Sequence, residues 1–358
     1  MTSARPSIKE LTLAEVASRL CEAGVVESSS TLPVQLYHGI QRDLRGSIPA
    51  IPGVRRERLE AADALFASDS LRLLSVHRSP DLSARFAFAL QDGAIVESVL
   101  LHHHGRWTVC VSSQAGCPLA CSFCATGMLG LTRSLEAWEI VDQVLQVARH
   151  ARARIGDVVF MGMGEPLLNE AAVYRATDVL REEHGCQISP RRINVSTAGV
   201  VPAIHRFIDA RRPLRLLFSL GSADPQKRAR LMPIQRTWGF DAFLDAVRRY
   251  ERLRRGKHVT LEYVAIRNLT LGDDDIEAIR EHLVGFRFIL NVIPLNPVGN
   301  ELQAPALEEV LAWTAKLRPL GFPVKVRYSG GRDQLAGCGQ LGRSLLLMRD
   351  VSVCAAPS

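Results

Sequence analysis

A β-then-α rhythm runs from Thr108 to about residue 293 and constrains the fold more than any other feature of the sequence. Short apolar segments of strand length alternate there with longer stretches that have helical spacing of apolar residues. The predicted strands are Thr108–Ser112, Asp157–Met161, Ile193–Thr197, Leu214–Leu220, Thr260–Ile266 and Phe288–Ile293. Apolar strands separated by helices require a parallel sheet covered on its outside. We therefore predict an α/β fold of six β/α units, as in a barrel, a partial barrel or a doubly wound sheet.

The preceding residues form two further predicted parts. Apolar residues at helical spacing over 10–22, 36–44 and 55–66 predict a small helical module. Three strand-like segments follow over 71–77, 84–90 and 94–101, and Gln91-Asp92-Gly93 is typical of a hairpin turn. We expect an N-terminal accessory domain over 1–102, a core over 103–345 and a C-terminal tail over 346–358.

Composition excludes several classes of protein. The 358 residues are 47% apolar and 23% charged, which is enough to bury a sizeable core and excludes disordered, fibrous and small disulfide-stapled chains. We find no run of 18 apolar residues and no secretory signal at the start, so we expect a cytoplasmic protein that does not enter membranes. Eight cysteines in such a chain indicate metal binding or redox chemistry rather than disulfides.

Three of these cysteines, Cys117, Cys121 and Cys124, lie at spacings of four and three directly after the first predicted strand. A structural zinc site normally takes four protein ligands, whereas an iron–sulfur cubane can take three thiolates and leave one iron open for a substrate. The spacing favours the cluster. A zinc site completed by one of three adjacent histidines, or three unrelated buried cysteines, remain the alternatives; the histidines are His102, His103 and His104.

With this motif the sequence resembles the radical S-adenosylmethionine superfamily, and further motifs resemble its RlmN/Cfr family of RNA adenine methyltransferases. The resemblance covers roughly residues 95–345. It rests on the segments Cys110-Val111-Ser112-Ser113-Gln114-Ala115-Gly116-Cys117, Met161-Gly162-Met163-Gly164-Glu165-Pro166-Leu167-Leu168-Asn169 and Ala336-Gly337-Cys338-Gly339-Gln340-Leu341. The expected fold is then a partial (β/α)6 barrel radical SAM core with a small helical N-terminal domain and a β-hairpin extension.

The resemblance implies two cofactors. A [4Fe–4S] cluster would be held by Cys117, Cys121 and Cys124, and S-adenosyl-L-methionine would chelate the fourth iron. The residues implied to contact S-adenosylmethionine lie where the predicted strands end, and they are Gly164, Glu165, Ser196, Ser219, Leu220, Gly221 and Asn296. Gly221 departs from the family, which usually has histidine there, so it could offer only its backbone. Turn formation or helix capping is the alternative for the serine, asparagine and glycine positions.

The resemblance also implies a catalytic pair of cysteines. Cys338 would carry a methyl group on sulfur, and Cys110, 228 positions earlier, would form a transient disulfide with it. Glu97 matches the family's proton acceptor, with a solvated strand residue as the alternative. Without the family, two such cysteines would be interpreted as inertly buried. Gly337 and Gly339 flank Cys338 and suggest a mobile loop.

RNA is the expected partner. The net charge of +7 and the pairs Arg191-Arg192 and Arg211-Arg212, with Arg252-Leu253-Arg254-Arg255, are compatible with phosphate binding, although such arginines are more often solvated surface. The family acts on an adenosine of large-subunit rRNA, and some members act on tRNA. An electron donor such as flavodoxin or ferredoxin is also implied. Two other functions stay open: a radical SAM enzyme acting on a peptide or small molecule, and a noncatalytic RNA-binding protein stabilised by a metal.

Overall fold

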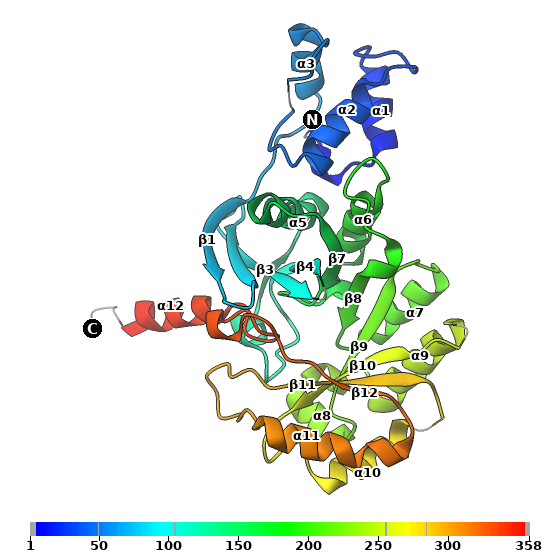
Figure 1. Ribbon diagram of the computed structural model, residues 1–358, viewed down its shortest axis with the longest axis vertical. Coiled ribbons are helices and arrows are strands. Elements are labelled where there is room, and N and C mark those ends of the chain that lie inside the picture. The colour runs from blue at the N-terminus through cyan, green and yellow to red at the C-terminus, as the bar shows by residue number, and fades with distance from the viewer. Residues whose placement is uncertain (1–4, 49, 104, 255, 284, 355–358) are drawn as a thin grey trace.

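The computed structural model describes residues 5–48, 50–103, 105–254, 256–283 and 285–354, and its centre is a single ten-stranded sheet (Figure 1). The strand order is β1-β2-β3-β4-β7-β8-β9-β10-β11-β12. The strands are β1 (Arg72–Arg78), β2 (Ala84–Ala89), β3 (Ile95–His103), β4 (Arg106–Cys110), β7 (Ile155–Phe160), β8 (Ile193–Thr197), β9 (Arg215–Gly221), β10 (Val259–Ala265), β11 (Phe288–Pro294) and β12 (Val324–Val326). Each predicted strand is present.

The strands from β4 to β12 pair in parallel, each with its neighbour in the strand order. The antiparallel strands β1, β2 and β3 extend this sheet beyond β4. No closing pair joins β1 to β12 among the described residues. The predicted α/β class with an open, partial barrel and a β-hairpin extension is therefore confirmed.

Helices cover the outer face of the sheet and carry apolar stripes toward it. They are α5 (Ala137–Ala151), α6 (Glu170–Arg181), α7 (Val201–Asp209), α8 (Pro225–Leu231), α9 (Phe240–Leu253), α10 (Asp273–Leu283) and α11 (Leu307–Lys316). Two further helices, α4 (Ala125–Leu129) and α12 (Arg343–Cys354), pack against each other instead. Because successive strands are linked through the covering helices, their carboxyl ends share one edge of the sheet, where active sites of such folds lie.

The N-terminal segment folds as the predicted helical module, with α1 (Leu13–Glu22), α2 (Leu32–Tyr37), the π-helix η2 (His38–Arg42) and α3 (Arg56–Asp63). Thr12 and Glu15 form a capping box that fixes the start of α1. The module has its own apolar cluster, separate from the main core. A buried ion pair of 2.7 Å between Lys9 and Asp142 attaches it to α5.

Two predicted domain limits fall inside continuous structure. The limit at residue 102 lies near the end of β3, which pairs with β4, and the limit at 345 lies within α12. The domain division therefore stays a prediction, and residues 355–358 of the predicted tail lie outside the described residues. In the described part of the chain, no helix is both long and apolar enough to cross a membrane.

Candidate active site

The three-cysteine loop is closed by a small hairpin that the sequence did not predict. Strands β5 (Gln114–Gly116) and β6 (Leu131–Ser134) pair on either side of the loop. Gly116 has a φ of +80°, and a Cβ there would lie 1.8 Å from the carbonyl oxygen of Gly130. Only glycine allows this approach, which lets the Cys117 amide donate to that same carbonyl at 2.9 Å. The hairpin thus gathers the cysteines into one compact loop.

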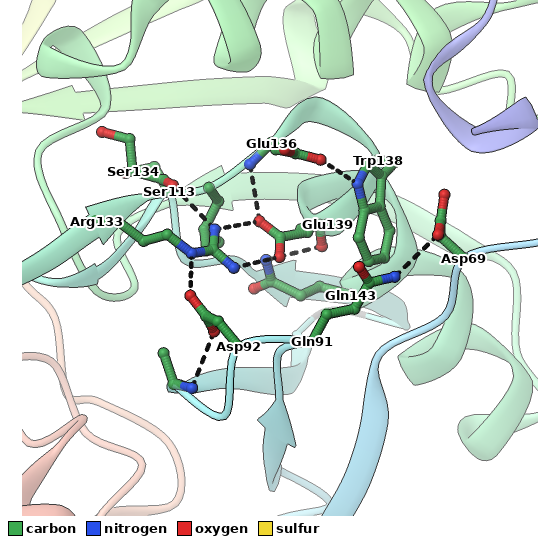
Figure 2. A network of polar contacts seen from close by, with 12 residues as sticks. Asp69, Gln91, Asp92, Ser113, Arg133, Ser134, Glu136, Trp138, Glu139 and Gln143 are labelled. Carbon is green, nitrogen blue, oxygen red and sulfur yellow. Dashed lines mark hydrogen bonds and ion pairs between the residues drawn. The ribbon is translucent and has the colours of Figure 1, made fainter. Parts of the chain in front are cut away.

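Arg133 of β6 fixes this hairpin to the core, as Figure 2 shows. Its guanidinium donates to both carboxylate oxygens of Glu139 at 2.7 Å and to Asp92 at 2.5 Å. Glu139 belongs to α5, and Asp92 to the turn between β2 and β3. A bidentate arginine–carboxylate contact is directional, so the base of the three-cysteine loop is held in a fixed orientation.

The donor set of this loop fits an iron–sulfur cluster. Burial raises the pKa of Cys117 to about 12, with the neighbouring Cys124 adding to the shift. Burial, then Cys124 and Cys117, raise the pKa of Cys121 well above its ordinary value. Burial also raises the pKa of Cys124, so iron would be needed to stabilise these three thiols as thiolates and release their protons. Cys117, Cys121 and Cys124 are therefore the residues that could hold the cluster.

A single metal ion would need a tighter arrangement. Among the described residues, no three His, Cys, Asp or Glu side chains are placed as ligands of one ion. His102 and His103 of the zinc alternative are among these described residues, whereas His104 lies outside them. A cubane differs because each thiolate binds a different iron.

The Cys338 loop, residues 336–341, packs directly against the three-cysteine loop, residues 117–130 between β5 and β6. The Ala125 amide donates to the carbonyl of Gly339 at 2.7 Å, and the Thr126 hydroxyl donates to the carbonyl of Leu341 at 2.6 Å. A Cβ on Gly339 would lie 2.9 Å from the Phe123 carbonyl oxygen, and its φ is +83°. Close approach therefore explains this glycine, and loop mobility stays a prediction.

Asn296, which follows β11, holds the same loop from the other side. Its side-chain amide donates to the Cys338 carbonyl at 2.9 Å and to the Ser329 hydroxyl at 3.0 Å. The Cys338 amide in turn donates to the Ser329 oxygen at 3.1 Å. Asn296 is buried whereas Cys338 is exposed, so a buried amide holds the backbone of an exposed loop.

Cys110 ends β4 and Cys338 follows β12, and the two line one pocket although β4 and β12 stand six positions apart in the sheet order. Curvature of the sheet brings their carboxyl ends together. The other residues of this pocket include Val99, His103, Met161, Arg327 and Tyr328. Burial raises the pKa of Cys110 to about 11, so this thiol is protonated near neutral pH. The structure thus brings together the two predicted catalytic cysteines.

Glu165 joins two loops at the same edge of the sheet. Its carboxylate accepts from the Ala198 amide at 2.8 Å and from the Leu167 amide at 3.0 Å. Burial raises its pKa to about 7 despite these two hydrogen bonds. Gly164 has a φ of +98°, and a Cβ there would lie 2.5 Å from the side chain of Gln114. Both residues therefore have structural roles beside the predicted contact with the cofactor.

Ser196 and Ser219 meet inside the sheet, with their hydroxyl oxygens 3.4 Å apart. The Ser196 hydroxyl also donates to Glu262 of β10 at 2.9 Å. The second carboxylate oxygen of Glu262 is buried without a hydrogen-bond partner, 3.9 Å from Arg327. Burial raises the pKa of Glu262, and Arg327 opposes the shift.

Sequence reasoning did not identify Glu262 or Arg327. A usable signal was present, because Glu262 is a lone carboxylate in an otherwise apolar strand, and such strands are buried on both faces. Arg327 had no comparable signal, since it follows a three-residue edge strand.

Leu220 and Gly221 end strand β9. Leu220 is buried, and its carbonyl accepts from the Arg228 guanidinium at 2.9 Å. Gly221 has a φ of +71°, and a Cβ there would lie 2.6 Å from the sulfur of Met232. Met232 thus fills the space next to the position where the family has histidine, which gives the departure at Gly221 a local reason.

Glu97 is not a solvated strand residue, so that alternative is wrong. It is buried and forms an ion pair with Arg85 of β2. Its carboxylate also accepts from the Gly342 amide at 2.7 Å and from the Ser344 hydroxyl at 3.0 Å. Glu97 therefore anchors the chain just after the Cys338 loop, and its predicted role as proton acceptor stays a prediction.

Comparison with known proteins gives a consistent result. Residues 111–283 match the radical SAM superfamily. The chain is 36% identical over 341 residues to a probable RNA methyltransferase of Myxococcus xanthus, covering 94% of each protein. It is 41% identical over 276 residues to the dual-specificity RNA methyltransferase RlmN of Syntrophobacter fumaroxidans, covering 76% of this chain and 80% of the relative.

A solved structure matches almost the whole chain. The crystal structure of a radical SAM methyltransferase from Sphaerobacter thermophilus superposes with a TM-score of 0.88 at 36% identity, covering 94% of this chain and 99% of the other. These likenesses favour an RNA methyltransferase over a radical SAM enzyme acting on a peptide or small molecule and over a noncatalytic RNA-binding protein. The chain is a member of the RlmN/Cfr family of S-adenosylmethionine-dependent radical RNA methyltransferases.

Proposed function

We propose that this enzyme methylates a ring carbon of adenine, at position 2 or 8, in large-subunit rRNA, with tRNA as a second substrate. The observation that carries the proposal is the shared pocket of Cys110 and Cys338 beside the three-cysteine loop. These adenine carbons are poor nucleophiles, so simple displacement on a sulfonium methyl group is ineffective there. A radical route through a thioether avoids that difficulty.

In this proposal Cys338 is the residue that carries the new carbon. Its thiol would lose a proton and take a methyl group on sulfur from one S-adenosylmethionine, which leaves as S-adenosylhomocysteine. Cys117, Cys121 and Cys124 would hold a [4Fe–4S] cluster, which with a second S-adenosylmethionine would supply the electron and the radical that removes one hydrogen atom from that methyl group. The resulting methylene radical on Cys338 adds to the adenine ring and joins the protein to RNA. Cys338 is an exposed residue that lines the pocket, which supports access of an RNA base to it, whereas burial of its sulfur raises the pKa of the thiol to about 12.

Release of the product requires Cys110. The joined species would give up one electron to the oxidised cluster and the ring proton to Glu97, the proposed proton acceptor. Attack of the Cys110 thiolate on the Cys338 sulfur then breaks the carbon–sulfur bond and leaves a disulfide between the two cysteines. The freed carbon takes up a proton and becomes the methyl group. A protein electron donor, such as flavodoxin or ferredoxin, reduces the cluster and regenerates the two thiols.

The other predicted site residues are proposed to bind S-adenosylmethionine. Gly164 and Glu165 would face its amino acid portion, and Ser196, Ser219, Leu220, Gly221 and Asn296 would complete the site. Support comes from their placement, because all lie at or just beyond the carboxyl ends of β7, β8, β9 and β11. A target base must leave its stack to enter this pocket, so an adenosine in a loop or bulge is the expected substrate.

The test is Cys338→Ala in an RNA methylation assay with reconstituted enzyme. Methyladenosine should fall to background, and the intact wild-type protein should carry one methyl group on the Cys338 peptide by mass spectrometry. Cys21→Ala is the matched control, because that cysteine is exposed on the N-terminal module. Retained turnover in Cys338→Ala contradicts the covalent route. Nucleoside standards decide between positions 2 and 8.

A further inference from the structure

Six cations gather at the edge of the sheet opposite the active site. Three loops bring them together, each leading from a helix or turn into the start of β8, β9 or β10. Two adjoining pockets lie there and share Leu214, Leu253 and Arg254. The cations lining them are Arg191, Arg211, Arg212, Arg215, Arg254 and Lys257, and no carboxylate lines either pocket among the described residues. We call this surface the basic groove.

The cations of the basic groove have few carboxylate partners. Some exposed arginines elsewhere are neutralised by ion pairs, as in Arg206–Glu170 and Arg280–Glu277. In the basic groove, only Arg212 has an ion pair among the described residues, to Asp178 at 3.5 Å. Five like charges without carboxylate partners repel one another, and a bound polyanion would relieve that repulsion.

Aromatic rings orient two of these guanidinium groups. Arg212 lies 4.2 Å over the ring of Tyr174, and Arg254 lies 5.8 Å from the ring of Tyr250. Stacking reduces the freedom of the side chains and leaves the N–H edges available, which suits two-point recognition of phosphate oxygens. Leu253 lines both pockets and is 51% exposed, so the groove presents an apolar side chain among its cations.

We propose that the basic groove binds phosphate groups of the RNA substrate at a distance from the reacting base. This inference rests on the proposed function, since it takes RNA as the substrate. The groove lies at the amino ends of the strands, whereas the Cys338 loop lies beyond their carboxyl ends; Figure 1 shows α7 and α9 on the right and α12 on the left. A folded RNA is large enough to contact both edges, and phosphate contacts set its register without reading bases.

The test neutralises the groove and follows RNA binding against salt. The variant is Arg211→Gln/Arg215→Gln/Arg254→Gln, and the probes are transcribed large-subunit rRNA and tRNA. Each phosphate contact contributes roughly 0.7–0.9 to the slope of log affinity against log salt, so three lost contacts should reduce that slope by about two to three. In turnover, the KM for RNA should rise while kcat at saturating RNA stays near the wild-type value.

The matched control removes three charges from α10, α11 and the turn after it, in Arg280→Gln/Lys316→Gln/Arg318→Gln. Its salt slope should stay at the wild-type value. Should the groove triple variant melt early, the single variant Arg215→Gln replaces it, with an expected slope change of about 0.8. Formation of 5′-deoxyadenosine without RNA should be the same in all these proteins.

Two results overturn the inference. One is an equal salt slope for the groove variant and the control. The other is slower reduction by an acidic electron-donor protein with unchanged RNA binding, which would assign the groove to that protein. Failure of adenine methylation in the wild-type enzyme is a separate outcome, because the salt slopes of RNA binding can be measured without turnover.

Discussion

The side-chain amide of Asn296 donates a 2.9 Å hydrogen bond to the backbone carbonyl of Cys338, across 42 residues of sequence. Together with Ser329, it holds the proposed methyl carrier at the mouth of the pocket. Asn296→Ala should therefore loosen the loop by about 1 kcal/mol. Faster amide hydrogen exchange over residues 336–341 would report this, and RNA methylation should fall with it.

Ser329→Ala separates the two functions proposed for Asn296. It removes the second contact of the loop but leaves the amide for S-adenosylmethionine. Exchange over 336–341 should rise in both variants, whereas S-adenosylmethionine binding, measured by equilibrium dialysis, should weaken only in Asn296→Ala. Equal binding in the two variants would count against Asn296 as a contact for the cofactor.

The thiol of Cys110 should limit product release below about pH 11. Burial raises its pKa to about 11, so about one molecule in a thousand carries the thiolate at pH 8. Decay of the protein–RNA adduct in a single turnover should then accelerate nearly tenfold per pH unit between pH 7 and 9. Cys110→Ser should accumulate the adduct at every pH. A flat profile would mean that another step limits release.

Much of this fold was predictable because buried parallel strands are nearly continuous apolar runs. The strands β7 and β10 follow that rule, and their ends placed the site at one edge. The β5–β6 hairpin was not predictable, since three and four residues carry no periodic signal, and its glycine contact depends on tertiary approach. Local sequence pattern therefore predicts long elements, whereas the formation of short elements depends on tertiary packing.

The proximity of Cys110 and Cys338 could not be predicted from local sequence pattern either. Curvature of the whole sheet places them in one pocket, and a family resemblance was the only signal in the sequence. For Glu97 the sequence left open a solvated strand residue, which is wrong because Arg85 of the neighbouring strand forms a buried ion pair with it. Ion pairs between strands leave no periodic pattern in the sequence from which they could be predicted.

Removing Arg85 should be far more damaging than its place on an edge hairpin suggests. Arg85→Gln leaves the buried Glu97 carboxylate without a cation, which costs about 3–5 kcal/mol of unfolding free energy. Urea unfolding measures this loss. Arg56→Gln breaks an exposed pair with Glu60 and should cost less than about 1 kcal/mol. Equal losses would contradict the anchoring role of Glu97.

Replacing Gly221 alone with the histidine that is usual in the family should destabilise the protein. A Cβ there would lie 2.6 Å from the Met232 sulfur, and the φ of +71° strains any side chain. Gly221→His should therefore cost about 1–3 kcal/mol of unfolding free energy. Gly221→His combined with Met232→Ala should recover part of that loss. If the single variant is as stable as the wild type, Met232 does not explain the departure.

Glu262→Gln tests whether the carboxylate inside the sheet is held for function. Burial raises its pKa, so its contribution to stability is present below the ordinary carboxyl range and is lost as pH rises through the folded-state pKa. The free energy of unfolding of the variant, relative to the wild type, should thus increase as the pH rises above the ordinary carboxyl range. Glu309→Gln, at an exposed pair with Arg267, is the control.

S-adenosylmethionine binding should weaken in Glu262→Gln alone, because Ser196 loses a charged acceptor. Unchanged binding would leave Glu262 with a structural role only.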